Sequence, residues 1–225
     1  MSKESSQDNL AQRAAELRIR LGGKEPKTLA SRTATSFPGI EKGSGEFHFS
    51  LWGRRVILTY PALQVLDAHN KQDLSIFDQT MVLYYFNTCD GTPMAASWIA
   101  FSELPDGRFY NQAFQGYTGR ELVKAFGNDL EAFEAAARNA GGEKRFPMVG
   151  TPLGDSAFVY QVLPRVALLV VYWLGDEDFP PNSQILFDAA ASHQMPTDAY
   201  AILGSTLTRR LLKKPSQENT LTFRS

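Results

Sequence analysis

The run VALLVVYWL at residues 166–174 is the most apolar stretch of the chain and constrains the fold most strongly. An α-helix needs roughly 20 apolar residues to cross a bilayer, so this shorter run is expected to be a buried strand. A strand without polar alternation has both of its faces covered. Residues 156–163 (SAFVYQVL) precede it, and Leu163-Pro164 lies at the bend between them. The two segments therefore predict a β-pair inside a covered sheet.

Alternation and turn residues predict further strands, over residues 46–51, 56–61, 62–68, 97–101 and 183–189. Apolar residues at helical spacing predict helices over residues 7–21, 118–141 and 197–214. The second of these starts with a capping box at residues 118–121, in which Thr118 is the cap, and is interrupted at residues 127–129. The start signal formed by Ser75 and Asp78 predicts a helix over residues 75–87. Residues 75–87 are rich in aromatic residues, which leaves a strand open as the alternative there. Polar and turn-forming residues predict irregular structure over residues 24–44, 103–119 and 143–156.

Clustered strands with segregated helices are typical of the α+β class. We expect a single α+β domain with a largely antiparallel sheet over residues 45–214. An N-terminal helix and irregular arm, residues 1–44, precede it, and a polar tail, residues 215–225, follows. The helix of the arm packs either on the domain or on another subunit.

Charge and cysteine content exclude several classes of protein. The formal net charge of -1 gives no basic surface for nucleic acid, which needs many lysines and arginines. A single cysteine excludes an internal disulfide and a thiolate-rich zinc or iron–sulfur site. The polar start, MSKESSQDN, has no apolar signal core. We therefore expect a cytoplasmic protein that binds neither nucleic acid nor membrane.

The stretch FDAAASHQMPTD at residues 187–198 is the first candidate site. Asp188 ends a strand and is followed by small residues, so Asp188 and His193 could chelate a metal or act as a general acid–base pair. Their spacing matches no metal-binding signature. The favoured alternative is that both side chains satisfy loop amides. Thr197 and Asp198 are explained as the N-cap and first turn of the next helix.

The aromatic stretch GRFYNQAFQGYTG at residues 107–119 is the second candidate. Its side chains could form the wall of a pocket that stacks on a planar ligand, with Arg108 beside it. The favoured alternative places the rings of Tyr110, Phe114 and Tyr117 in the core. Asp106, just before the stretch, is explained as part of a proline turn.

Other reactive side chains have structural explanations. Arg165, between a proline and the apolar strand, is expected to pair with a buried carboxylate, and an anionic ligand is the alternative. Cys89 is expected to be a buried thiol rather than a nucleophile. The acidic run at residues 176–178 is expected at a solvated turn. The sequence has no glycine-rich phosphate loop, G-x-S-x-G or H-E-x-x-H motif.

Three segments together resemble the family known as domain of unknown function 3786: DGTPMAASWIAFSELPDGRFYNQAF, VLPRVALLVVYWLGDEDFP and ILFDAAASHQMPTDAYAILG. The resemblance covers residues 45–212, and no activity is established for this family of anaerobic bacteria and archaea. Some of its members are described as iron–sulfur proteins because of an extra cysteine-rich N-terminal module, which the residues before 45 here do not contain. The resemblance points to the L-P-x-G, D-E-x-F-P and F-D-A…P-T-D segments as a surface.

The leading functional hypothesis is a binding or accessory domain in anaerobic metabolism, for a small molecule or a partner protein. One alternative is a hydrolase- or transferase-type enzyme that uses Asp188 and His193 as its acid–base pair. Another is a homo-oligomeric scaffold in which the N-terminal helix exchanges between subunits. The sequence does not identify a cofactor. The candidate ligand-binding residues are Asp188, His193, Arg165, Arg108, Tyr110, Phe114 and Tyr117.

Overall fold

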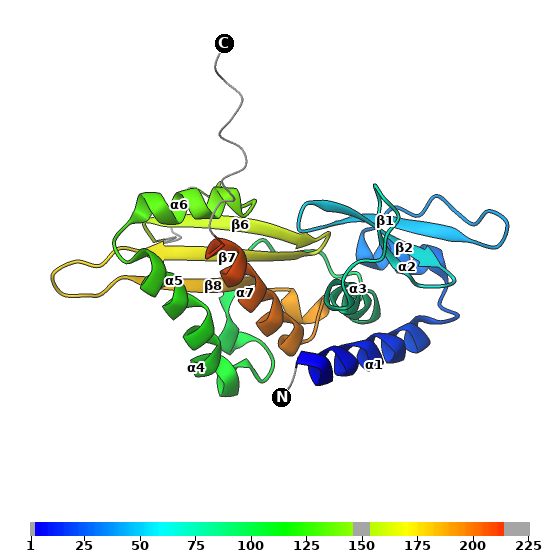
Figure 1. Cartoon of the computed structure of the whole chain (residues 1–225), viewed down its shortest axis with the longest axis horizontal. Coiled ribbons are helices and arrows are strands. Elements are labelled where there is room, and N and C mark those ends of the chain that lie inside the picture. Colours follow the sequence, from blue (N-terminus) through cyan, green and yellow to red (C-terminus); the bar gives the residue numbers. More distant parts are fainter. Residues whose placement is uncertain (1–2, 146–153, 214–225) are drawn as a thin grey trace, which may run out of the picture.

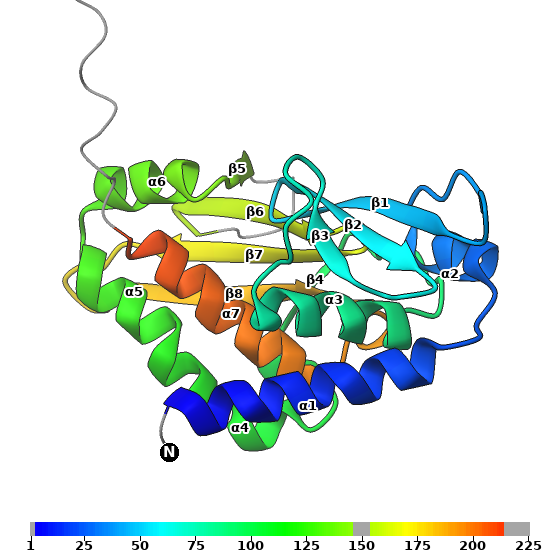
Figure 2. The same cartoon turned by 45° about the vertical axis from the view of Figure 1, so that its right-hand side comes forward.

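The computed structural model describes residues 3–145 and 154–213, and it confirms a single α+β domain with antiparallel sheets. A three-stranded sheet has the order β1-β2-β3, and a five-stranded sheet has the order β4-β8-β7-β6-β5 (Figures 1 and 2). All pairings between these strands are antiparallel. Their bounds are β1 Gly45–Leu51, β2 Arg54–Tyr60, β3 Val65–Asp67, β4 Trp98–Ala100, β5 Glu143–Arg145, β6 Ser156–Leu163, β7 Val166–Trp173 and β8 Asn182–Asp188.

The helices lie around these sheets. Their bounds are α1 Lys3–Leu21, α2 Pro26–Thr33, α3 Ile76–Thr88, α4 Gly107–Tyr117, α5 Gly119–Phe126, α6 Leu130–Asn139 and α7 Thr197–Leu211, with short 3₁₀ turns at Phe101–Glu103 and Ala191–His193. No helix in the part of the chain that the structure describes is long and apolar enough to cross a membrane.

The predicted β-pair, β6 and β7, lies in the five-stranded sheet, with β7 in the middle. Residues 166–172 of β7 are all buried, as its uniform apolarity predicts. Helix α7 crosses one face of this sheet (Figure 2). Apolar side chains on the strands of the sheet form a second, separate cluster: Ala157, Val159, Ala167, Leu169 and Val171.

The three-stranded sheet packs with the N-terminal helices. Helix α1 lies along α3 (Figures 1 and 2), and Leu17 and Leu21 of α1 are buried in the main core. Residues 75–87 form the predicted helix rather than the strand, since Ser75 caps α3 by accepting a hydrogen bond from the amide of Asp78. The helix of the arm therefore packs on the domain of its own chain.

The prediction of irregular structure over residues 24–44 was wrong for α2. Glu25 caps this helix by accepting bonds from the amides of Lys27 and Thr28, and Pro26 occupies its first turn. Proline suits that position because its missing N–H has no partner there. The burial of Leu29 fixes α2 in the core.

Residues 107–117, also expected to be irregular, form the helix α4. Tyr110, Phe114 and Tyr117 recur at helical spacing, and the burial of Phe114 stabilises the helix despite its glycines. The expected break at residues 127–129 separates α5 from α6. The strand β5, residues 143–145, lies where a loop was expected, and residues 146–153 and the predicted tail lie outside the described residues.

Two threonines predicted to cap helices donate their hydroxyl groups to carbonyl oxygens instead. Thr118 is the N-cap residue of α5, but its hydroxyl donates to the carbonyl oxygen of Phe114, 2.5 Å away, and makes no capping bond to the helix. Pro196, rather than Thr197, is the N-cap residue of α7. The hydroxyl of Thr197 donates instead to the carbonyl oxygen of Pro105, 2.7 Å away. This bond joins the start of α7 to the loop before α4.

Candidate functional site

A pocket of about 700 Å³ lies between α4, the 3₁₀ turn at residues 191–193 and the start of α7. The two candidate stretches of the sequence, residues 107–119 and 187–198, therefore meet at one cavity. The residues that line it are Phe101, Pro105, Asp106, Tyr110, Ala113, Tyr117, Ser192, Met195, Pro196, Thr197, Asp198, Ala201 and Ile202.

Helical spacing builds the first wall of the pocket. Tyr110, Ala113 and Tyr117 of α4 recur at intervals of three and four residues, so they share one face of the helix. Phe114 lies on the buried side, where its ring stacks on Phe101 with the centroids 4.1 Å apart. The stacked pair holds the buried side of α4 against the core.

The second wall is the first part of α7. Asp198, Ala201 and Ile202 recur at the same helical intervals and face the cavity. The bond from Thr197 to Pro105 fixes this wall relative to the loop that leads into α4. The geometry of the pocket is thus set by the Thr197–Pro105 hydrogen bond between its walls and by the Phe101–Phe114 stack on the buried side of α4.

The lining is mostly apolar, with a few polar groups. Its charged side chains are two carboxylates, Asp106 and Asp198, and Ser192 and Thr197 add hydroxyl groups. An apolar cavity with a few polar groups is the usual form of a small-molecule site. The pocket can surround the body of an organic ligand and contact a polar group at its edge.

The predicted aromatic residues divide between pocket and core. Tyr110 and Tyr117 line the pocket, whereas Phe114 is fully buried. Arg108 is exposed on α4 and lies outside the lining. The two explanations of this stretch therefore each hold for part of it, because a helix presents one side to the core and another to the cavity.

Asp188 holds loops together. Its side chain lies in the core, and its two oxygens accept bonds from the amides of Ala95, Ala96 and Ala190 at 2.8–2.9 Å. This arrangement is the favoured alternative from the sequence, in which the carboxylate satisfies loop amides. No hydrogen bond joins Asp188 to His193 in the described structure, so the two residues are not a directly bonded pair.

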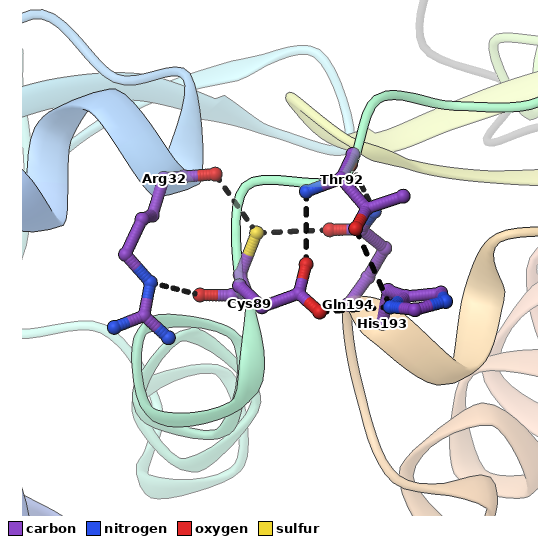
Figure 3. Close-up of polar contacts among 6 residues, drawn as sticks. Arg32, Cys89, Thr92, His193 and Gln194 are labelled. Carbon is purple, nitrogen blue, oxygen red and sulfur yellow. Dashed lines mark hydrogen bonds and ion pairs between the residues drawn. The ribbon is translucent and has the colours of Figure 1, made fainter.

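His193 pairs instead with Asp90, across more than a hundred residues of sequence. Its Nδ1 lies 2.8 Å from Oδ2 of Asp90 and 3.3 Å from the hydroxyl of Thr92 (Figure 3). The other oxygen of Asp90 accepts a bond from the amide of Thr92. The bonds from His193 and Thr92 hold the pKa of the Asp90 carboxyl well below its usual range. Nothing in the sequence pairs these residues, since Asp90-Gly91 has the composition of an ordinary turn.

Cys89 is a buried thiol, as expected. Its Sγ lies 2.8 Å from Oε1 of Gln194 and 3.0 Å from the carbonyl oxygen of Arg32 (Figure 3). The side-chain Nε2 of Gln194 donates to the carbonyl oxygen of Thr92. Burial raises the pKa of the Cys89 thiol, which keeps it protonated at neutral pH. This network fastens the end of α3 to the loop that carries His193.

Arg165 has a different partner from the one expected. Its Nε donates to the carbonyl oxygen of Arg32, 2.9 Å away, rather than to a carboxylate. Arg32 lies in the last turn of α2, where unpaired carbonyls attract a cation. Arg165 does not line the pocket.

The remaining candidates lie away from the pocket or lack ligands for a metal. Asp176 forms the predicted turn by accepting bonds from the amides of Asp178 and Phe179. Of the segments in the family resemblance, L-P-x-G and P-T-D contribute to the pocket, whereas D-E-x-F-P does not. Within residues 3–145 and 154–213, no three His, Cys, Asp or Glu side chains lie close enough to hold a metal ion.

Comparison with known proteins confirms the resemblance. No curated protein and no solved structure matches the chain. A family model described as "Domain of unknown function (DUF3786)" matches residues 25–210, so the match includes α2 and begins before the expected boundary at residue 45. The matched region spans most of the chain and includes every residue that lines the pocket. The chain therefore belongs to the DUF3786 family.

Proposed function

We propose that this protein is a binding domain that takes a small molecule into the pocket between α4 and α7. The observation that carries the proposal is the cavity itself, whose volume of about 700 Å³ suits an organic ligand of moderate size. Its walls come from the two candidate stretches of the sequence, residues 107–119 and 187–198. Because neither Arg108 nor Arg165 lines it, an anionic ligand is not favoured.

Support for a preformed site comes from the contacts behind its walls. Phe101 and Phe114 stack beneath α4, and Thr197 bonds to Pro105 at the start of α7. A site that is held in shape before binding loses less conformational entropy when the ligand enters. The pocket can therefore bind without a rearrangement of either helix.

A thermal-shift screen of the whole chain tests this proposal. Compounds that raise the melting temperature are tested again on Ala113→Trp and Ala201→Trp, each of which places a large ring in the cavity. Ala135→Trp is the matched control, because Ala135 is an exposed alanine on α6 outside the lining. A ligand that binds only the folded chain raises its stability by mass action.

We expect hits to lose their effect on both pocket variants and to keep it on Ala135→Trp. Hits that stabilise all three variants equally would contradict the proposal, since the ligand would then bind elsewhere. A partner protein is the alternative occupant, and Phe109, which is 83% exposed on α4, would suit it. The place of such binding in anaerobic metabolism and in the cytoplasm is part of the proposal and rests on the family resemblance.

A second candidate function is proton transfer by His193. The contact of its Nδ1 with Asp90 favours the tautomer that carries the proton on Nδ1 and leaves Nε2 free to act as a base. The imidazole is about half exposed, so a substrate can reach it. This pair, rather than Asp188 with His193, is the acid–base arrangement that the structure supports.

Hydrolysis of a panel of carboxylic and phosphoric esters tests the second candidate. We expect any activity to be lost in His193→Gln and reduced in Asp90→Asn. His69→Gln is the control, because His69 is an exposed histidine in the turn after β3, away from His193 in the fold. Activity that persists in His193→Gln would exclude this function for the residue.

A further inference from the structure

We infer that the pocket between α4 and α7 binds an organic cation, an apolar body that carries an ammonium group. This inference rests on the proposed function and adds the chemical class of the ligand. It follows from the charges in the lining, from their common position at one end of the pocket and from the aromatic rings beside them.

The charges in the lining have one sign. Asp106 and Asp198 are the charged residues of its lining, and among residues 3–145 and 154–213 no lysine, arginine or histidine lines the cavity. Both residues are exposed, and neither takes part in an ion pair within the described residues. The only hydrogen bond to the Asp198 carboxylate there comes from the amide of the next residue, Ala199, 3.0 Å from its Oδ1. Both carboxylates can therefore accept a bond from a cationic donor.

The two carboxylates lie at the same end of the pocket. Asp106 follows Pro105, and Asp198 follows Thr197, and these neighbours are joined by a 2.7 Å hydrogen bond. Each carboxylate thus flanks that bond, one at the start of α4 and the other at the start of α7. A cationic group bound near this bond would be attracted by both carboxylates.

Aromatic rings lie next to the carboxylates. Tyr110 lies one helical turn beyond Asp106, and it is 65% exposed, while Tyr117 is 41% exposed. The face of a tyrosine ring attracts an ammonium group, and rings combined with carboxylates are suited to organic cations. Tyr117 also lines a separate shallow hollow, together with Ala201, Ile202, Ser205 and Arg209 of α7, so the two helices lie side by side there. Arg209 lines this hollow and not the pocket itself.

These positions set the orientation of the ligand. The ammonium group lies between Asp106 and Asp198, and the apolar body extends toward Tyr117 and Ile202. Asp198 also has an alternative explanation that involves no ligand, because a carboxylate in the first turn of α7 stabilises the helix through its dipole. An experiment must therefore measure binding, because a purely helix-stabilising carboxylate would not change ligand affinity.

Calorimetric titration with three indole compounds provides this test. Tryptamine is cationic, tryptophol is neutral and indole-3-acetate is anionic, and they share one ring system. We expect tryptamine to bind roughly five- to tenfold more tightly than tryptophol, from an exposed ion pair and a ring contact. Added salt should weaken the binding of tryptamine and leave that of tryptophol unchanged.

The double variant Asp106→Asn/Asp198→Asn should bring the two dissociation constants together by weakening only tryptamine. Glu131→Gln is the matched control, because Glu131 is an exposed acidic residue in the first turn of α6. It removes a carboxylate from the same position in a helix without touching the pocket. We expect it to keep the full preference for tryptamine.

Equal affinities for tryptamine and tryptophol, or a preference that survives in the double variant, would overturn the inference. If tryptophol still binds and Ala113→Trp blocks it, the proposed pocket stands while the charge preference fails. Failure of tryptamine to bind would also overturn the inference. The proposed function itself is tested separately, by the effect of the two tryptophan variants on the hits of the thermal-shift screen.

Discussion

Asp188 is a buried carboxylate with three backbone partners and no positive charge bonded to it in the described structure. Two of its bonds reach the loop before β4 and the third reaches the turn after β8. Backbone amides can take the place of the water that would otherwise solvate a buried carboxylate, since each hydrogen bond compensates part of its desolvation. Asp188 therefore fixes the loop that leads to His193 without contacting the pocket.

Asp188→Ala should lower the free energy of unfolding by about 3 kcal/mol, because it leaves buried amides without acceptors. Asp198→Ala, which changes an exposed carboxylate at the start of α7, should cost less than about 1 kcal/mol. Urea unfolding of the two variants checks the difference. Similar losses in both would show that the amide bonds of Asp188 contribute little.

The hydrogen-bond partners of individual side chains could not be predicted from the sequence. His193 and Asp90 are 103 residues apart, and Asp188 lies 93 residues from Ala95. Side-chain type and local spacing predicted that Asp188 and His193 had polar roles, but pairing depends on which loops the sheets bring together. Asp106 and Asp198 were assigned to turn and helix chemistry because each has a sufficient local explanation.

At the scale of elements, α4 and α5 differ in how closely they approach their surroundings. A Cβ at Gly119 would lie 2.1 Å from the carbonyl oxygen of Ser183 on β8, whereas nothing lies within 4 Å of a Cβ at Gly116. The glycine at the start of α5 lets that helix approach the sheet. The glycine near the end of α4 has no such packing role.

Gly119→Ala should lower the free energy of unfolding by roughly 1–3 kcal/mol, because the backbone must move apart. Gly116→Ala should raise it by about 0.5 kcal/mol, because alanine favours the helix and meets open space. Thermal and urea unfolding of the two variants measure both changes. The same sign for both would contradict the close approach of α5 to β8.

The turn after β3 depends on the ionisation of Asp67. Bonds from the amide of Asn70, the side chain of Arg54 and the amide of His69 lower the pKa of Asp67 to about 2, from an ordinary value of 3.8. A carboxyl whose pKa is lowered on folding stabilises the fold above its unfolded pKa, and this contribution is lost as the pH falls through the folded pKa.

The stability difference between the wild-type chain and Asp67→Asn should therefore be constant above about pH 5. It should shrink as the pH falls from about 4 toward 2. Urea midpoints of both chains across this range measure it. A difference that stays the same at acid pH would show that ionised Asp67 does not stabilise the turn.

Strong local patterns explain which elements the sequence predicted. The strands β6, β7 and β8 follow from apolarity, α3 from the start signal of Ser75 and Asp78, and α7 from helical spacing. Helix α4 was missed because Pro105, Gly107 and Gly116 suggested a loop, while its one buried face depends on the Phe101–Phe114 stack. Helix α2 was missed because its cap is a glutamate followed by proline, in a stretch rich in loop-forming residues.

At the scale of the whole molecule, one core extends from α1 to α7. It includes Leu17 of the first helix, Leu29 of the second and Leu211 of the last. The backbone amide of Trp52, at the turn of the first hairpin, donates to the carbonyl oxygen of Val162 in the other sheet. The two sheets are therefore joined by a hydrogen bond as well as by apolar packing.

Deletion of residues 1–23 should expose the surface of α3 that α1 covers. Burial of Leu17 and Leu21 alone contributes about 3–6 kcal/mol, so the shortened chain should unfold much more easily. Urea unfolding together with mass in solution checks this. A homo-oligomeric scaffold that exchanges α1 between subunits predicts instead an oligomer that becomes a stable monomer, which would contradict packing within one chain.

The pocket is a product of the whole molecule, because its walls are far apart in the sequence. The sequence identified both stretches, but it could not show that they meet, and it included Asp188 and Arg165, which serve other contacts. What brings the walls together is the sheet, which places β4 beside β8 and so the start of α4 beside the start of α7.

A crystallographic fragment screen of the whole chain would show whether the cavity between α4 and α7 is a binding pocket. We expect bound fragments to gather against Tyr110, Tyr117 and Ile202, with amine-bearing fragments directed toward Asp106 and Asp198. Fragments that bind repeatedly elsewhere while this cavity stays empty would contradict this expectation.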